Sequence, residues 1–168
     1  MGRVHKTLAM RVLEGQGVPY EVVVFPDTIH DALEVARYAS LPPEMVYKTL
    51  VAEAEDPGSK PFLFLVAATR TLNLKKAAQA VGARKLRMAR HVDAERLTGL
   101  KVGGISALAL LNKGFAIYLD EWAVLLDEIV VSAGERGLNL RLRVDDLIRV
   151  TGAQLVDVSE EQPEYGSV

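Results

Sequence analysis

The apolar residues of this chain occur in short runs that are separated by polar residues, prolines and glycines. Two such runs, 49–52 and 61–69, flank a polar loop over 55–59 that contains Pro57 and Gly58. A loop of this kind between two apolar runs predicts an antiparallel hairpin, and we expect this hairpin at the centre of a sheet. Further strands are expected in the segments rich in β-branched and aromatic residues, namely 20–25, 115–119, 129–132, 138–142 and 154–158.

The remaining periodic segments predict helices. They cover 5–14, a stretch through 32–36 that ends before Pro42, 73–81 and 145–150. The candidate N-cap residues are Asp27, Thr28 or Asp31 for the second helix, Asn73 for the third and Asp145 for the last. Gly82 is expected to end the third helix in the left-handed conformation, because glycine adopts that conformation without a steric cost.

These elements predict an α+β fold. Short strands outnumber helices and several are joined as hairpins, which favours a mixed, largely antiparallel, barrel-like sheet with surrounding helices. The length of 168 residues fits one domain, which we expect over 1–158, followed by a flexible polar tail over 159–168. The apolar runs are far shorter than the roughly 20 residues of a membrane-spanning helix, and no signal-peptide core follows the N-terminus, so a cytoplasmic protein is expected.

The composition excludes several kinds of catalytic and metal-binding site. The chain has no cysteine and three scattered histidines, which removes disulfides, thiolate ligands and a cysteine nucleophile. We therefore expect neither a metal nor a cofactor. The glycine-rich signatures of dinucleotide and nucleoside triphosphate sites are absent from the sequence as well.

The net charge of −2 conceals a basic segment. Residues 57–92 contain eight Lys or Arg residues and no Asp or Glu, so this segment carries +8 and the rest of the chain −10. Lys75 and Lys76 stand in the first turn of the third predicted helix, where cations oppose the helix dipole unless an anion binds there. The segment is either a face that contacts phosphates or a solvated surface, and the sequence leaves both interpretations open.

Two short segments carry residues suited to chemistry. Lys48 stands in the apolar run 46–51, and because a buried lysine is costly without an anion, its side chain either reaches solvent or faces a functional cleft. Gly103 and Gly104 would let a ligand approach the backbone, whose N–H groups can stabilise an oxyanion. A glycine pair more often marks an ordinary bulge or tight turn, so on the residues alone that interpretation is favoured.

Four segments of the chain, taken together, carry a more specific signal. They are 46–50, 72–78 with 81–85, 102–106 and 130–138. In their order and spacing they resemble the YbaK/EbsC family of aminoacyl-tRNA editing deacylases. The resemblance extends over nearly the whole chain, from the opening helix to about Asp157.

The resemblance implies a fold and an activity. The fold is a six- or seven-stranded barrel-like sheet, shared with the editing insertion domain of bacterial prolyl-tRNA synthetases. The implied activity is hydrolysis that removes a wrong amino acid from the acceptor end of an aminoacyl-tRNA, here tRNA(Pro) carrying cysteine, alanine or another small residue. Prolyl-tRNA synthetase is then a candidate partner and no cofactor is needed. Mechanisms proposed for relatives use a bound water, a tRNA hydroxyl or the side chain of the misplaced amino acid as nucleophile.

The resemblance also implies roles for individual residues. Four residues form the expected catalytic group. Lys48 would contact the tRNA end or orient the ester, and the backbone of Gly103 and Gly104 would line the acyl pocket and donate to the ester oxygen. Ser106 is the fourth. The expected substrate contacts are Phe25, His30, Thr49, Ser132 and Asn139, and the expected tRNA contacts are Lys75, Lys76, Arg84 and Lys85. No serine nucleophile is assigned, because no histidine base stands near Ser106 or Ser132 in the sequence and no nucleophile-elbow motif is present.

Three positions depart from the family pattern. Many members have a proline where this chain has Ala107, and the cysteine-specific branch has a tyrosine and an aspartate in place of Phe25 and Asn139. The cysteine specificity is therefore not carried over as it stands. Two alternatives remain beside the editing hydrolase: a module that binds a tRNA acceptor end or a synthetase without hydrolysis, and a hydrolase of other small acyl esters.

Overall fold

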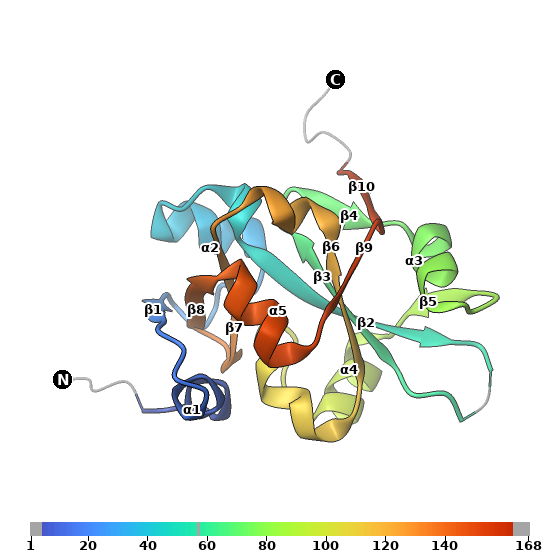
Figure 1. The fold of residues 1–168 in the computed structure, drawn as a ribbon, viewed down its shortest axis with the longest axis horizontal. Helices are drawn as coiled ribbons and strands as arrows, with labels where there is room; N and C mark the ends of the chain where they lie inside the picture. Colours follow the sequence, from blue (N-terminus) through green and yellow to red (C-terminus); the bar gives the residue numbers. More distant parts are fainter. Residues whose placement is uncertain (1–4, 57, 163–168) are drawn as a thin grey trace.

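The structure, a computed structural model, describes residues 5–56 and 58–162. Its strands form three sheets around which short helices are arranged (Figure 1). The largest sheet has the order β5-β2-β3-β6-β9, the second β1-β8-β7 and the third β10-β4. The strands are β1 (Glu21–Val24), β2 (Tyr47–Ala54), β3 (Phe62–Ala67), β4 (Arg70–Leu72), β5 (Leu86–Met88), β6 (Ala116–Asp120), β7 (Glu128–Glu135), β8 (Leu138–Arg143), β9 (Gln154–Val156) and β10 (Ser159–Glu161).

The predicted central hairpin is confirmed. β2 and β3 are antiparallel, and Lys48 is paired with Val66 in their register. β3 lies in the middle of the five-stranded sheet, because β6 pairs with its other edge. Leu63 and Leu65 belong to one core cluster and Phe64 to another, so β3 is covered on both faces. A strand buried on both faces explains the uninterrupted apolar run of the sequence.

The prediction of a mixed, largely antiparallel sheet is confirmed in its coarser form. Five of the seven strand pairs are antiparallel, and the pairs β3-β6 and β6-β9 are parallel. A parallel bridge between Val46 and Val130 joins the start of β2 to β7. The described strands nevertheless belong to three separate sheets, and no closed barrel is found among them.

The helices are α1 (Leu8–Gly15), α2 (Ala32–Ala39), α3 (Leu74–Val81), α4 (His91–Thr98) and α5 (Val144–Thr151), with the 3₁₀ turns η1 (Pro43–Met45), η2 (Leu108–Lys113) and η3 (Glu121–Leu125). Asp31 and Asn73 cap α2 and α3 as predicted, since their side chains accept bonds from backbone N–H groups one turn later. Gly82 ends α3 with φ 73°. The prediction that Asp145 caps the last helix is wrong, because α5 begins at Val144 and its N-cap residue is Arg143.

The C-terminal segment is ordered beyond the expected boundary at residue 158. Ser159–Glu161 forms β10, which pairs antiparallel with β4. The Ser159 hydroxyl is buried and donates to Asp120, 2.7 Å away, and it accepts from Arg70 at 2.6 Å. The expectation that the flexible tail begins at 159 is therefore corrected, and its remainder from 163 on lies outside the described residues.

The main core lies between the five-stranded and three-stranded sheets and includes residues of α1, η2 and α5. A second cluster lies under α3, and a third joins α2 to β1 and β7. α2 and α3 lie toward opposite ends of the molecule, with β2 running between them (Figure 1). None of the helices in the described part of the chain has the length and apolar character of a membrane span.

Candidate functional site

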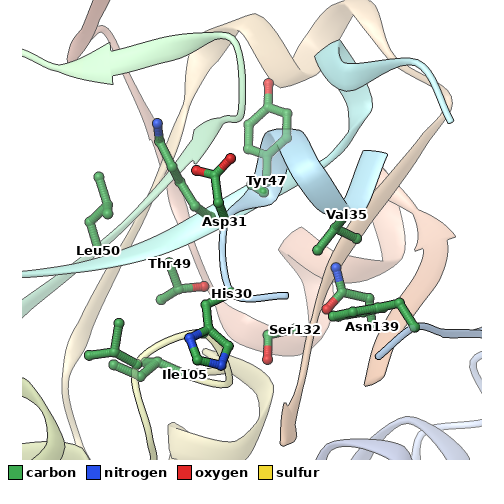
Figure 2. A pocket seen from close by; sticks show the side chains of 14 residues that line it. His30, Asp31, Val35, Tyr47, Thr49, Leu50, Ile105, Ser132 and Asn139 are labelled. Atoms are coloured by element: carbon green, nitrogen blue, oxygen red, sulfur yellow. The ribbon is translucent and has the colours of Figure 1, made fainter. Parts of the chain in front are cut away.

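A pocket opens where four segments meet. They are the N-terminus of α2, the first half of β2, the loop 102–106, which we call the glycine loop, and the β7-β8 hairpin. Its volume is about 170 Å³. Figure 2 shows side chains from these separate segments converging around it. The residues that line it are Phe25, His30, Asp31, Ala32, Val35, Tyr47, Lys48, Thr49, Leu50, Val102, Gly103, Ile105, Ser132 and Asn139. The fold thus brings together seven of the nine residues predicted to be catalytic or to bind substrate.

Lys48 is the cation of this pocket. It is half-buried near the start of β2, and burial lowers the pKa of its ammonium group from the usual 10.5. The carboxylate of Asp31 acts in the opposite direction and raises that pKa. Asp31 is held by its cap bond to the Glu34 N–H, 3.2 Å away. Lys48 therefore lines a pocket in which a partly desolvated cation attracts an anion more strongly than in water.

The glycine loop is fixed against its neighbours by close backbone contacts. Gly103 has φ +93°, and a Cβ at this position would stand 3.0 Å from the Cβ of His30. A Cβ on Gly104 would stand 2.8 Å from the backbone N of Arg136. Both positions therefore require glycine, one at the pocket wall and the other against the β7-β8 turn.

Side chains anchor the same loop from both directions. The Glu95 carboxylate accepts a bond from the Val102 N–H at 2.9 Å, and the Arg136 guanidinium donates to the Val102 carbonyl at 2.7 Å. The Gly104 N–H donates to the Lys101 carbonyl at 2.7 Å. It is therefore not free to bind an oxyanion, contrary to the prediction. The Gly103 N–H has no hydrogen-bond partner within the described residues, which leaves it available.

Ser106 and Gly104 do not line the pocket. Ser106 is 1% exposed, and its hydroxyl accepts a bond from the Ala109 N–H at 3.3 Å, which stabilises the start of η2. The placement of Ser106 in the catalytic group is corrected, because the loop turns inward after Gly103 and directs this serine into the core.

The pocket holds no preassembled pair of nucleophile and base among the described residues. The Ser132 hydroxyl accepts from the Gly134 N–H at 3.1 Å. The His30 Nε2 bonds to the Asp27 carbonyl at 2.9 Å, and because a carbonyl only accepts, this nitrogen carries the proton. The Nδ1 of a neutral His30 is then an acceptor. Over 5–56 and 58–162, no three His, Cys, Asp or Glu side chains are grouped so that they could hold a metal ion.

Two polar side chains in the pocket lack protein partners. The Thr49 Oγ1 is buried and has no hydrogen-bond partner in the part of the chain that the structure describes. The Asn139 side chain is 6% exposed and likewise makes no hydrogen bond with the described residues. Figure 2 shows the Thr49 hydroxyl directed toward Ser132 and the Asn139 amide beside Val35. A buried polar atom is normally satisfied, so the Thr49 hydroxyl is available for a bound molecule, and the Asn139 amide can contact the same molecule.

The basic segment forms no separate site near this pocket. Lys76 pairs with Asp157 at 3.1 Å, and Lys85 stands 3.9 Å from Glu55. The segment's α3 and β5 lie toward the far end of β2, where Ala52–Ala54 pairs with β5 (Figure 1). Of the four predicted tRNA contacts, Lys75 and Arg84 have no ion-pair partner within the described residues. The charge excess of this segment is thus partly neutralised by carboxylates from elsewhere in the chain.

Sequence reasoning missed several residues of the pocket wall. Tyr47 and Leu50 flank the predicted lysine on β2, and Val102 and Ile105 flank the predicted glycines. All four residues stand next to the predicted site residues in the sequence, and this proximity was the signal that could have identified them. Asp31 was recognised as a helix cap, and its second role beside Lys48 depends on the packing of α2 against β2.

Comparison with known proteins gives a consistent result. The model of the aminoacyl-tRNA editing domain matches residues 26–150. A protein of Enterococcus faecalis named "Putative Cys-tRNA(Pro)/Cys-tRNA(Cys) deacylase EbsC" is 32% identical over 159 residues, which cover 94% of this chain and 95% of that protein.

Solved structures agree with this assignment. One described as a "putative trans-editing enzyme for prolyl tRNA synthetase" is 30% identical, with a TM-score of 0.78 over 94% of this chain and 99% of the other. The protein APE2540 has the same fold, with a TM-score of 0.82 over 91% of this chain and 99% of the other at 21% identity. The match to the family model and the full-length similarity to EbsC show that the chain belongs to the aminoacyl-tRNA editing domain family.

Proposed function

We propose that this protein is a trans-editing hydrolase that deacylates mischarged aminoacyl-tRNA. The observation that carries the proposal is the shared pocket of Lys48 and the Gly103 loop, in a chain of the editing family. An ammonium group and a free backbone N–H are the donors that an ester needs when negative charge develops on its carbonyl oxygen. The four residues Lys48, Gly103, Thr49 and Asn139 are the proposed contacts of the reacting ester and its acyl group.

The size of the pocket favours a small amino acid. A cavity of about 170 Å³ is close to the roughly 150 Å³ that accommodates benzene in an engineered protein core. Phe25, Val35 and Ile105 provide apolar walls, while Ser132 and Asn139 provide polar contacts. Cysteine, alanine or another small residue fits this combination.

The reaction is a hydrolysis in which water supplies the nucleophile. The water oxygen bonds to the ester carbonyl carbon, the Lys48 ammonium and the Gly103 N–H stabilise the oxyanion, and the bond to the ribose oxygen then breaks. The ribose oxygen takes a proton, and the products are the free amino acid and tRNA. The Nδ1 of His30 is an acceptor at the pocket wall that can orient the water or accept its proton.

The named relatives guide the choice of tRNA and partner. EbsC is named for cysteinyl-tRNA(Pro) and cysteinyl-tRNA(Cys), and the structure of 30% identity is described with prolyl-tRNA synthetase. We infer that tRNA(Pro) is the tRNA and that this synthetase is the source of the mischarged substrate. A tRNA substrate supports the proposal of a cytoplasmic protein, and we assign the activity to one domain that includes β10.

A deacylation panel tests the proposal. Purified protein is mixed with tRNA(Pro) carrying labelled cysteine, alanine or proline, and release of the amino acid is measured against the uncatalysed rate. We expect turnover of one or both of the mischarged forms and little turnover of prolyl-tRNA(Pro). Lys48→Ala should lower the rate by 10²-fold or more, by comparison with removal of one oxyanion donor in other hydrolases. The exposed Lys60→Ala is the matched control and should retain the full rate.

The panel also decides between the alternatives. Absence of turnover of any aminoacyl-tRNA together with tight tRNA binding would replace the hydrolase by a binding module. Equal turnover of small amino acid esters and of aminoacyl-tRNA would indicate an esterase that does not recognise tRNA. Lys48→Arg separates charge from shape, because it retains the cation and alters its geometry.

A further inference from the structure

The acyl pocket continues into an open groove on the far side of His30. His30 lines both the pocket and this groove. The groove has a volume of about 770 Å³ and is lined by Asp27, Thr28, His30, Gly99, Leu100, Lys101, Gly134, Glu135 and Arg136. A third hollow shares Gly99, Leu100, Gly134 and Glu135 with it and leads on to η2 and the start of α1. The three hollows therefore adjoin one another in a row that runs from the acyl pocket past His30 and across the surface, and this row is called the path below.

Unpaired cations lie along this path. Lys101 and Lys113 are exposed, Arg136 is half-buried, and within the described residues none of the three has a carboxylate partner. The Lys113 ammonium lies over Gly99, 4.0 Å from where a Cβ would stand, at the junction of the second and third hollows. On the basic segment Lys76 and Lys85 each have a carboxylate within 4.0 Å, whereas Lys75 and Arg84 have no ion-pair partner among the described residues.

The acids of the groove offset these cations only in part. Glu135 is bonded to the His5 imidazole at 2.8 Å, which occupies its carboxylate without cancelling its charge while the imidazole is neutral. Asp27 is exposed at the near edge and has no ion-pair partner among the residues described. Glu95 accepts from the backbone of the glycine loop. Leaving aside Lys6, which pairs with Glu14, three cations along the path (Lys101, Lys113 and Arg136) face two carboxylates (Asp27 and Glu135), so the balance is one positive charge.

We propose that the single-stranded 3′ end of the tRNA follows this path, with its terminal ribose at His30 and its phosphates beside Arg136, Lys101 and Lys113. The proposal rests on the proposed function, which puts the aminoacyl ester in the pocket. A positively charged groove that tracks the backbone is the usual means of holding a single strand. Gly99 leaves its part of the groove wall without a side chain, which lets a sugar-phosphate chain approach the backbone beside Lys113. The acceptor strand thus departs toward η2, away from α3.

The test measures binding of an uncharged RNA hairpin that carries the acceptor stem and its single-stranded 3′ end. The variants are Lys101→Ala/Lys113→Ala and, as the control, Lys75→Ala/Arg84→Ala on the basic segment, which removes two of the tRNA contacts that the family resemblance implies and so tests the competing face. All four side chains are exposed, so the melting temperature should be unchanged. Each phosphate contact to a single strand contributes about 0.7 to the slope of log K against log salt, so the first variant should lose about 1.4 from that slope. The control variant should lose none.

A truncated hairpin without the single-stranded end completes the design. Wild type and Lys101→Ala/Lys113→Ala should bind this truncated RNA equally. An unchanged salt slope for Lys101→Ala/Lys113→Ala on the complete hairpin would overturn the path, as would a larger loss in the control variant. Failure of the proposed function has a different signature: the wild-type protein would then release no amino acid from any aminoacyl-tRNA, whichever lysines it carries.

Discussion

The Cβ of His30 lies 3.0 Å from the position that a Cβ would occupy on Gly103. The pocket wall is thus closed where the His30 side chain packs against Gly103, which has no side chain of its own. Because His30 also bonds to the Asp27 carbonyl, it has little freedom to withdraw. The position of the free Gly103 N–H therefore depends on this contact.

Gly103→Ala should impair deacylation more than it impairs folding. The added methyl group must displace His30 or the loop, and the backbone at φ +93° adds strain of roughly 1–3 kcal/mol. A displacement of about 1 Å at a reacting group can lower a rate by about 10²-fold, so we expect a loss of 10- to 100-fold in kcat/KM. Steady-state deacylation and thermal unfolding of the same preparations measure the two effects.

Second-site variants identify the cause of that loss. His30→Gly removes the Cβ that the new methyl group meets, so Gly103→Ala/His30→Gly should recover part of the activity relative to the His30→Gly background. His30→Ala keeps that Cβ and should give no recovery. Equal behaviour of the two double variants would show that backbone strain alone, and not the contact, governs the loop.

Lys48→Met should make the folded protein more stable at neutral pH while abolishing its activity. Burial lowers the pKa of Lys48 in the folded state below 10.5, so folding is penalised while the side chain is charged. The penalty is complete below the lowered pKa and disappears as the pH rises to 10.5 and above, where the lysine is neutral in both states. Chemical denaturation at pH 7 and near pH 10.5 measures this difference.

The control for Lys48→Met is Lys60→Met at an exposed position. It should leave the free energy of unfolding nearly unchanged at both pH values. A Lys48→Met protein that is less stable than wild type at pH 7, or whose difference from wild type is independent of pH, would contradict a desolvated ammonium in the pocket.

Local chemistry accounts for the elements that the sequence predicted well. The Pro57-Gly58 loop indicated the β2-β3 hairpin, and Asn73 and Gly82 marked the ends of α3, because each signal acts on neighbouring residues. α4 was not predicted: it is a polar helix whose N-cap residue, Arg90, makes no side-chain cap bond. β10 was expected to be tail, since its pairing with β4 joins residues far apart in the sequence.

The candidate site likewise combines residues that local sequence motifs identify with residues whose position depends on the tertiary fold. Lys48 and Gly103 could be identified from their segments, but Ser106, three residues after Gly103, is buried because the loop turns into the core. The sequence left open whether the basic segment contacts phosphates or is a solvated surface, and it could not show that the partners of Lys76 and Lys85 are acids outside the segment. The run of like charge therefore did not reveal which cations remain free.

Thr49→Val should stabilise the free protein and weaken its interaction with substrate. The buried Oγ1 of Thr49 has no partner in the described structure, and an unsatisfied buried hydroxyl costs about 1–3 kcal/mol. Valine has nearly the same shape, so the free energy of unfolding should rise by about 1 kcal/mol. Loss of one hydrogen bond to the acyl group should lower kcat/KM by roughly threefold to tenfold.

Thr49→Ser is the matched variant for this position. It keeps the hydroxyl and removes the methyl group, so it should retain most of the activity while losing some stability. If Thr49→Val deacylates as fast as wild type, the hydroxyl does not contact the substrate, and the polar contact to the acyl group would then fall to Asn139.

Ala107→Pro should stabilise the loop without altering its path. Ala107 has φ −61°, which matches the fixed φ of proline, and its N–H donates no backbone bond within the described residues. Proline at a compatible position stabilises by about 0.4–1 kcal/mol through the unfolded state, which corresponds to a rise of about 1–4 °C in melting temperature for a chain of this size. Ala109→Pro is the control, because it removes the bond from the Ala109 N–H to Ser106 and should lower the melting temperature. A fall for Ala107→Pro as well would mean that the proline ring does not fit at this buried position, and the alanine would then be a requirement of the core packing around η2.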